Sequence, residues 1–471
     1  MTESPWDNEG INVSVREFRV LCVVFFCSDE GSAWVCIGSG LSVFRSMAAR
    51  PSAKEVIELV DVEELRRAPI AILGGGAVGK TCGADCALAG QEVRICDLDP
   101  FFDNALGTVM RTGITLQDKA PGTQTKYGFR RMGKGEFAMA TNSVAEAVKG
   151  AKLIVVGIPS IAHEIFFREL IPALEDGQIV HIIPDNYGSL KLRKMMREMG
   201  CTKKVIIGGW SSAPYGTRVD TEGGVAKPTC SLVYRAITLR GAALPAKDTE
   251  DFVESSKALG CFDAITEGDG AVCGDTVMDI GFSNVNPVIH VPGTVLGVST
   301  MENFGTVLDK NIHDYSIYSH SFCPSISEVQ YQFYNEEIAL AEAMGVGIQP
   351  FKKEVFYQRT SVLGEEYMGE GCNVPFEEQW EVGFATGPFT IKNRYVTEDV
   401  PVGCHVYHEL GKKFGVPTPI IDSMIVLGGV MNKTNFFETG LTLDELGIGH
   451  MTKDQMQAYL REGEYVAPEG E

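Results

Sequence analysis

The stretch Pro69-Ile-Ala-Ile-Leu-Gly-Gly-Gly-Ala-Val-Gly-Lys-Thr81 decides the fold of this chain. Its first five residues, 69–73, form a short aliphatic run that predicts a buried strand, and a helix is predicted over 79–89. The glycines between them match G-x-G-x-x-G, in which the first makes a tight turn, the second admits a pyrophosphate and the third lets helix pack on strand. We therefore expect a dinucleotide-binding loop. Its predicted cofactor contacts are Gly74, Gly76, Ala77, Val78 and Gly79.

The same residues also fit a second motif. Gly74, Gly79, Lys80 and Thr81 spell G-x-x-x-x-G-K-T, the phosphate-binding loop of nucleoside triphosphatases. The next predicted strand, 92–96, ends at Asp97, about 20 residues beyond the loop, where a carboxylate accepts hydrogen bonds from an adenosine ribose. Asp97 favours NAD over NADP because a carboxylate repels a 2′-phosphate. An acid in this place also resembles partition-type ATPases, so that alternative stays open.

From residue 68 onward, short aliphatic strands alternate with helical stretches, which is typical of a parallel sheet with crossover helices. Ligands of such sheets bind beyond the carboxyl ends of the strands, and we expect Pro159 to contact the cofactor there. The predicted strand 153–158, which Pro159 follows, is not followed by an acidic residue that could bind magnesium. This argues against the ATPase. Further strands are predicted at 153–158, 179–183 and 204–207, and the sequence at 232–240 and 261–266 is also typical of strands. Helices are predicted at 143–149, 163–174 and 189–199.

Length and composition limit the classes of protein. A chain of 471 residues with 44% hydrophobic residues predicts two to three domains with real cores. Its net charge of −21 argues against nucleic-acid and anionic-membrane partners, and the longest apolar run near the start, 20–27, is far shorter than the roughly 20 residues of a membrane span. Thirteen cysteines, an odd number, form no dense disulfide framework, so we expect a cytoplasmic protein.

We expect three parts: an N-terminal appendage (1–67, with Met47 as an alternative start), a dinucleotide-binding domain (68–272) and a helical domain (273–471). The fold class is thus an α/β Rossmann-type domain followed by a mostly α-helical one. Helical patterns of the last part are predicted at 328–344, 406–414, 420–431 and 453–462, and a loop rich in Glu and Gly at 364–387. The pair His405 and His408 has helical spacing but no evident third ligand, so no metal is predicted.

Two segments of the helical part carry suggestive ionisable residues: Asn284-Val-Asn-Pro-Val-Ile-His290 and Arg394-Tyr-Val-Thr-Glu-Asp399-Val-Pro401. Taken alone, the histidine could be a core residue, and the second segment could be a helix start capped by Thr397. Together with the glycine loop and Gly415-Val-Pro-Thr-Pro-Ile420, however, they resemble the opine dehydrogenases, the octopine and nopaline dehydrogenase family. The resemblance covers roughly residues 68–450.

This resemblance implies NAD(P)H-dependent condensation of an amino acid with a 2-oxo acid such as pyruvate. It implies His290 as general acid/base, Asp399 as the carboxylate that orients it, and Arg394 as the guanidinium that holds a substrate carboxylate. An imidazole with a pKa near 6.5 suits those proton transfers, and a planar Arg fork suits a carboxylate. The residues before Pro214 lack the acid that the family pattern leads us to expect, so substrate detail stays open.

Other classes remain as alternatives. A hydroxy-acid dehydrogenase of the wider two-domain class would need no amine, and a dinucleotide sensor would bind NADH without turnover. The expected partners are small molecules, an amino acid and a 2-oxo acid, and the oligomer considered is a homodimer.

Overall fold

The computed structural model describes residues 60–118, 131–222, 225–348, 350–357, 386–468 and 470. All of them belong to one compact unit, Leu59–Glu471. Met47, most of the expected appendage and nearly all of the Glu-rich loop 364–387 lie outside the described residues. The domain limits 68–272 and 273–471 stay a prediction.

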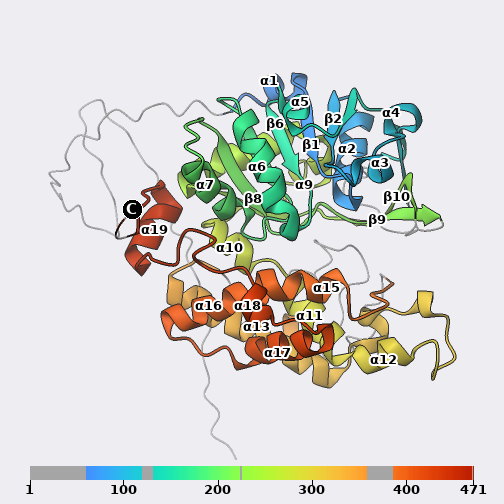
Figure 1. Cartoon of the computed structure of the whole chain (residues 1–471), viewed down its shortest axis with the longest axis vertical. Coiled ribbons are helices and arrows are strands. Elements are labelled where there is room, and N and C mark those ends of the chain that lie inside the picture. Colours follow the sequence, from blue (N-terminus) through green and yellow to red (C-terminus); the bar gives the residue numbers. More distant parts are fainter. Residues whose placement is uncertain are drawn as a thin grey trace, which may run out of the picture. The chain divides into compact units, whose positions relative to one another are not determined.

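An eight-stranded sheet forms the centre of the first half (Figure 1). The strand order is β12-β11-β8-β7-β6-β1-β2-β5; β11 runs antiparallel to β8, and the strands from β8 to β5 are parallel to one another. The order reverses between β1 and β6, which places a ligand crevice at their carboxyl ends. The bounds are β1 Ile70–Leu73, β2 Val93–Cys96, β5 Met139–Thr141, β6 Leu153–Val156, β7 Ile179–Ile182, β8 Ile206–Trp210, β11 Leu239–Ala243 and β12 Ala271–Cys273.

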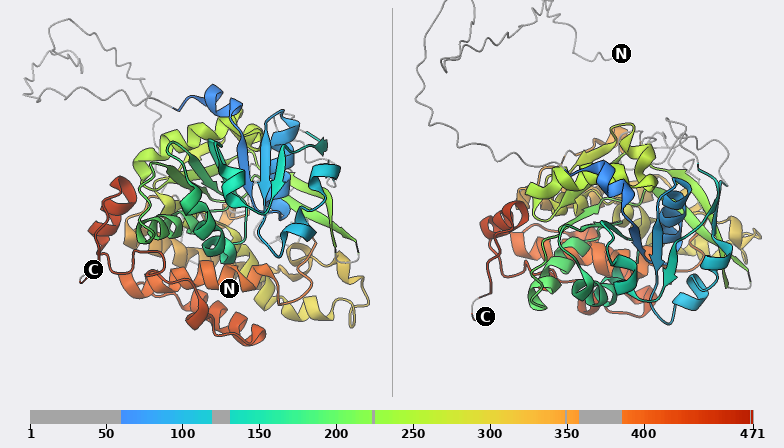
Figure 2. Two further views of the ribbon diagram at one scale, coloured as in Figure 1. Left: turned by 45° about the horizontal axis from the view of Figure 1, so that its top comes forward. Right: turned by 90° about the horizontal axis from the view of Figure 1, so that it is seen from above.

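Helices cover both faces of this sheet (Figure 2). One face packs against α5, α6 and α7, whose apolar side chains share a buried cluster with the central strands. The opposite face packs against α2 and α8. Burial on both faces explains why β1 and β6 are continuous aliphatic runs, and β7 departs from this pattern only at the buried His181. The bounds are α2 Ala77–Leu88, α5 Val144–Val148, α6 His163–Ala173, α7 Gly188–Glu198 and α8 Thr249–Ser255.

A second sheet, not predicted from the sequence, packs beside α2. Its order is β4-β3-β10-β9, with β3 Ile114–Asp118, β4 Gly133–Gly135, β9 Tyr215–Glu222 and β10 Val225–Arg235. A buried carboxylate ties it to the helix: Asp85 of α2 accepts hydrogen bonds from Arg131 Nε (2.9 Å) and Arg235 Nη1 (2.7 Å). The sheet is therefore held by contacts between residues far apart in the sequence.

Most predicted elements of the first half are confirmed, and three are corrected. The strand expected at 204–207 begins at Ile206 and continues to Trp210. The strand-rich text at 261–266 forms a 3₁₀ turn and helix α9 (Asp263–Thr266), since a short apolar run does not distinguish a strand from a buried helical turn. Residues Val62–Arg67, assigned to the appendage, form helix α1, which Asp61 caps and whose Leu65 is buried against the sheet domain.

The second half is mostly helical and has its own core, which confirms the expected fold class. The four helical patterns are confirmed as α13, α16, α17 and α19. The bounds are α10 Val277–Phe282, α11 Asn286–Leu296, α12 Val298–Asn303, α13 Pro324–Met344, α15 Arg394–Thr397, α16 His405–Phe414, α17 Pro419–Asn432, α18 Phe436–Thr439 and α19 Lys453–Glu462, with π-helical turns at Ile317–Ser321 and Val400–Cys404. Within the described ranges, no helix combines the length and apolar character that crossing a membrane requires.

Candidate active site

A cleft of about 530 Å³ lies between the carboxyl edge of the large sheet and the helical half. From the sheet side it is lined by the glycine loop, the segments after β6 and β7, and the start of β9. From the helical side it is lined by α11, the π-helical turn 317–321 and α15. Its volume falls within the range of small-molecule sites, and its position is where doubly wound sheets bind ligands.

The glycine loop meets the steric requirements of its motif. Gly74 has φ +118°, and a Cβ there would lie 2.6 Å from the carbonyl oxygen of Gly157. A Cβ at Gly79 would lie 1.9 Å from the carbonyl oxygen of Gly74, so only glycine allows the helix to start this close to the turn. A Cβ at Gly76 would meet nothing within 4 Å, because this residue faces open space at the start of α2. The loop therefore fits a pyrophosphate lying against the helix N-terminus.

Asp97 lies beside this loop at the end of β2. Its Oδ2 accepts a hydrogen bond from the Gly75 N–H (3.0 Å), and its Oδ1 accepts one from the Leu98 N–H (2.8 Å). Burial raises the pKa of Asp97, and these two N–H groups and the charge of Lys80 oppose that rise. Backbone N–H groups thus hold both oxygens of the carboxylate at the edge of the glycine loop.

Lys80 is not placed as the lysine of a P-loop, the second motif that this sequence fits, would be. It is 1% exposed and burial lowers its pKa, whereas a P-loop lysine must reach the phosphates of its nucleotide. The ATPase alternative is therefore not favoured.

His290 and Asp399 meet at the helical wall of the cleft. His290 lies one turn into α11, and its Nδ1 is 2.8 Å from Oδ2 of Asp399. Its Nε2 is 3.2 Å from the hydroxyl oxygen of Tyr318, and its ring stacks on Tyr395 with centroids 3.6 Å apart and planes 3° apart. Burial raises the pKa of Asp399, and the hydrogen bond and charge of His290 oppose that rise. A carboxylate on Nδ1 fixes the tautomer that leaves Nε2 able to exchange a proton.

Arg394 lies on the same wall at the start of α15. Asn393 caps this helix by accepting a hydrogen bond from the Tyr395 N–H (2.9 Å), so the alternative cap Thr397 was wrong. The Arg394 Nε donates to Oε2 of Glu398, and its side chain is 66% exposed and lines the cleft. The cleft thus brings together Gly76, Ala77 and Val78 of the glycine loop, Pro159, the His290–Asp399 pair and Arg394. Three other predicted cofactor residues, Gly74, Gly79 and Asp97, are not among the residues that line it.

Sequence reasoning missed several polar residues around this site. Tyr318 and Tyr395 contact His290, and Glu398 contacts Arg394. Tyr395 and Glu398 lie inside the R-Y-x-x-E-D segment, which was the available signal, whereas Tyr318 belongs to a π-helical turn with no motif.

The other histidines considered do not build a metal site. His405 Nδ1 is hydrogen-bonded to the Leu441 carbonyl oxygen, and His408 Nδ1 to Asp422. No group of three or more His, Cys, Asp or Glu side chains in the described ranges could hold a metal ion.

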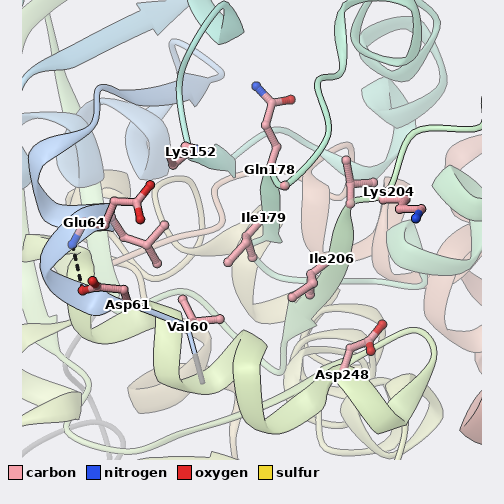
Figure 3. A pocket seen from close by; sticks show the side chains of 12 residues that line it. Val60, Asp61, Glu64, Lys152, Gln178, Ile179, Lys204, Ile206 and Asp248 are labelled. Atoms are coloured by element: carbon pink, nitrogen blue, oxygen red, sulfur yellow. Dashed lines mark hydrogen bonds between the residues drawn. The ribbon is translucent and has the colours of Figure 1, made fainter. Parts of the chain in front are cut away.

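A second hollow of about 400 Å³ lies at the opposite edge of the large sheet (Figure 3). Ile179 and Ile206 open β7 and β8 there, and Val60 and Glu64 approach from the α1 segment. None of the residues labelled in Figure 3 is a histidine, and the hollow lies at the amino ends of the strands, away from the ligand edge of such sheets. We therefore place the chemistry in the larger cleft.

Comparisons with known proteins agree with this architecture. The family model described as "NAD/NADP octopine/nopaline dehydrogenase, alpha-helical domain" matches residues 273–432. "Opine dehydrogenase" of Arthrobacter sp. (strain 1C) is 28% identical over 386 residues, which cover 81% of this chain and 96% of that relative. "Vitopine synthase" of Allorhizobium ampelinum is 24% identical, with 81% and 95% coverage.

Solved structures share the fold. Octopine dehydrogenase with NADH and L-arginine has a TM-score of 0.58 at 15% identity, covering 85% of this chain and 99% of that one. Yersinopine dehydrogenase bound to NADP+ has a TM-score of 0.57 at 13% identity, covering 84% of this chain and 98% of that one.

Proposed function

This chain belongs to the opine dehydrogenase family, and we propose that it catalyses the NAD(P)H-dependent reductive condensation of an amino acid with a 2-oxo acid such as pyruvate. One observation carries the proposal: the His290–Asp399 pair, the Arg394 guanidinium and a dinucleotide loop line one cleft. Its relatives include an opine dehydrogenase, and the octopine dehydrogenase structures hold NADH with L-arginine, agmatine or pyruvate. The hydroxy-acid and ATPase alternatives are not favoured.

The cofactor site consists of the glycine loop, Asp97 and Pro159. Gly76, Ala77 and Val78 line the cleft and would hold the pyrophosphate, while Asp97 would bind the ribose. When bound, the reduced nicotinamide supplies the hydride that reduces the imine. Asp97 favours NADH, and NADPH remains open because a neighbour in fold was solved with NADP+.

The side chains of the helical wall bind the substrate and transfer protons. Arg394 holds the carboxylate of the 2-oxo acid through its terminal nitrogens. His290 Nε2 takes a proton from the nitrogen as it attacks the keto carbon and delivers it to the keto oxygen, which gives a carbinolamine. A second uptake from nitrogen and delivery to the hydroxyl releases that oxygen as water and leaves the imine. Asp399 stabilises the imidazolium that exists between each uptake and delivery. The resulting imine carbon is the site of reduction.

The test is NADH oxidation, followed by its absorbance, with pyruvate and a panel of amino acids. We expect oxidation only when an amine and a 2-oxo acid are both present. Equal consumption without any amine would contradict the condensation and favour a hydroxy-acid dehydrogenase. NADH binding without turnover on the whole panel would favour a sensor.

We further propose that the enzyme acts in the cytoplasm, without a nucleic-acid partner, as a homodimer. The nine cysteines that the structure describes are free thiols, and the net charge is −21. Exposed apolar side chains on α17 and α18 support self-association, with Val430 73% exposed near Val426, Leu427 and Phe437. Light scattering on the purified chain tests this; a monomer at micromolar concentration would contradict the dimer.

A further inference from the structure

Glu398 is a buried carboxylate that joins the two halves of the molecule next to the proposed dyad. Its Oε1 accepts hydrogen bonds from the backbone N–H (2.8 Å) and the hydroxyl (3.0 Å) of Ser160, which directly follows Pro159. Its Oε2 accepts from Nε of Arg394. Glu398 is 3% exposed. Burial by itself raises its pKa, but the charge and hydrogen bond of Arg394 and the two bonds from Ser160 bring it below the ordinary value, so the group is a carboxylate.

The junction continues through amide side chains. The Asn186 side-chain N–H donates to the Ser160 hydroxyl oxygen (2.7 Å), and the Asn284 side-chain N–H donates to the Asn186 amide oxygen (2.6 Å). Asn284 Oδ1 in turn accepts from the Asn286 N–H (3.1 Å) at the start of α11, the helix that carries His290. One chain of hydrogen bonds therefore ties the segments after β6 and β7 to both catalytic segments of the helical half.

We propose that Glu398 is a positioning residue that sets the affinity for the 2-oxo acid and couples that site to the cofactor edge of the sheet; this inference rests on the proposed function. Glu398 accepts from Nε of Arg394, and among the described residues no hydrogen bond involves either terminal nitrogen of this guanidinium. Both terminal nitrogens can therefore bind a substrate carboxylate as a bidentate pair. Its second oxygen is held by Ser160. The guanidinium is thereby fixed relative to the segment that follows β6, where Pro159 lines the cleft.

A Glu398→Gln substitution tests this because no orientation of the amide satisfies both sides. If the amide oxygen accepts from Ser160, the amide N–H₂ faces the donor Nε of Arg394. If the amide is reversed, its N–H₂ faces the Ser160 N–H. One buried donor therefore lacks an acceptor in either case, although volume and shape are conserved.

We expect Glu398→Gln to raise KM for pyruvate by roughly 10- to 100-fold, with kcat at saturating substrate and the NADH dissociation constant changed by less than about threefold. Hydrogen exchange of a peptide that contains Ser160 should also become faster, because the charged acceptor of its amide is replaced by a weaker neutral oxygen in one orientation and by an N–H₂ group in the other. The matched control is Glu164→Gln: Glu164 lies four residues after Ser160, half exposed, and pairs with Arg168. This control should leave KM and exchange at Ser160 unchanged.

Two results would overturn the inference while the proposed function stands: a KM for pyruvate within twofold of wild type, or unchanged exchange at Ser160. If the wild-type enzyme itself shows no amine-dependent NADH oxidation, the proposed function fails, and the exchange measurement still decides whether Glu398 holds the junction. Should Glu398→Gln lack a cooperative thermal transition, Ser160→Ala replaces it. That variant keeps the backbone bond and removes only the hydroxyl, so KM should rise about two- to tenfold; an unchanged KM would refute the role.

Discussion

Replacing Asp399 by Asn should abolish most of the turnover without unfolding the protein. Asn has the shape of Asp, so the packing around the dyad is kept, but it cannot carry the charge that faces the imidazole. Asp399 Oδ2 is 2.8 Å from Nδ1 of His290. In the mechanism that we propose, His290 becomes an imidazolium between taking up a proton and delivering it. The substitution therefore removes stabilisation that exists only while the histidine is charged.

The magnitude follows from the strength of this contact. A hydrogen bond to a charged group contributes about 1.5–3 kcal/mol, and about 1.36 kcal/mol changes a rate tenfold, so kcat should fall at least about 10- to 150-fold. If the amide N–H₂ turns to Nδ1, the imidazole adopts the other tautomer and Nε2 can no longer accept a proton. The loss then approaches the full contribution of general acid–base catalysis, about 10²- to 10⁴-fold.

The thermal stability of the Asp399→Asn variant should not fall with its turnover. Burial raises the pKa of Asp399 in the folded protein, so its ionised form costs stability at neutral pH, and this cost decreases as the pH falls through the folded-state pKa. Asn lacks that charge but also loses part of a hydrogen bond. We therefore expect an unchanged or higher Tm at pH 7, and a gain over wild type that shrinks with acidification.

The assay is steady-state NADH oxidation together with a thermal melt at several pH values. The chain offers a matched control in His408 and Asp422, whose Nδ1 and Oδ1 are also 2.8 Å apart, away from the cleft. Asp422→Asn should leave kcat unchanged and lower Tm slightly, since Asp422 also accepts from Thr418. A kcat of Asp399→Asn within threefold of wild type, or an equal loss in Asp422→Asn, would refute the reasoning.

Three further substitutions test the cofactor and proton sites. Asp97→Ser should raise KM for NADH about tenfold and increase the ratio of kcat/KM for NADPH to that for NADH, since no carboxylate then faces a 2′-phosphate. Lys80→Met should keep NADH oxidation within about threefold of wild type and preserve Tm, because burial already disfavours the lysine charge; measurable ATP hydrolysis that this variant loses would restore the P-loop alternative. Tyr318→Phe, which removes a neutral hydrogen bond to Nε2 of His290, should lower kcat about two- to twelvefold, whereas an unchanged pH–rate profile would exclude Tyr318 from the proton path.

The dinucleotide-binding half could be predicted from the sequence wherever its structure depends on residues that are close together in the chain. The turn at Gly74 and the contact between Gly79 and Gly74 are set within six residues, so the motif itself encodes them. Strands buried on both faces appear as aliphatic runs for the same reason. The strand β9 has no such run, because it reads Tyr-Gly-Thr-Arg-Val-Asp-Thr-Glu. Its neighbour β10 is tied by Arg235 to Asp85, which belongs to another element. Local patterns carry no information about such a contact.

The candidate active site likewise contains residues that could be predicted from the sequence and residues that could not. His290, Arg394 and Asp399 were assigned roles through the family resemblance of their two segments, and the required chemistry suits those residue types. The segments that hold them also contain Asn284 and Glu398, whose partners are Asn186 and Ser160, 98 and 238 residues away. No spacing rule predicts these pairs, because they form only when the helical half packs on the strand ends. A chain with the dyad and the arginine but without Asn284 and Glu398 should therefore retain proton transfer and lose affinity for the 2-oxo acid.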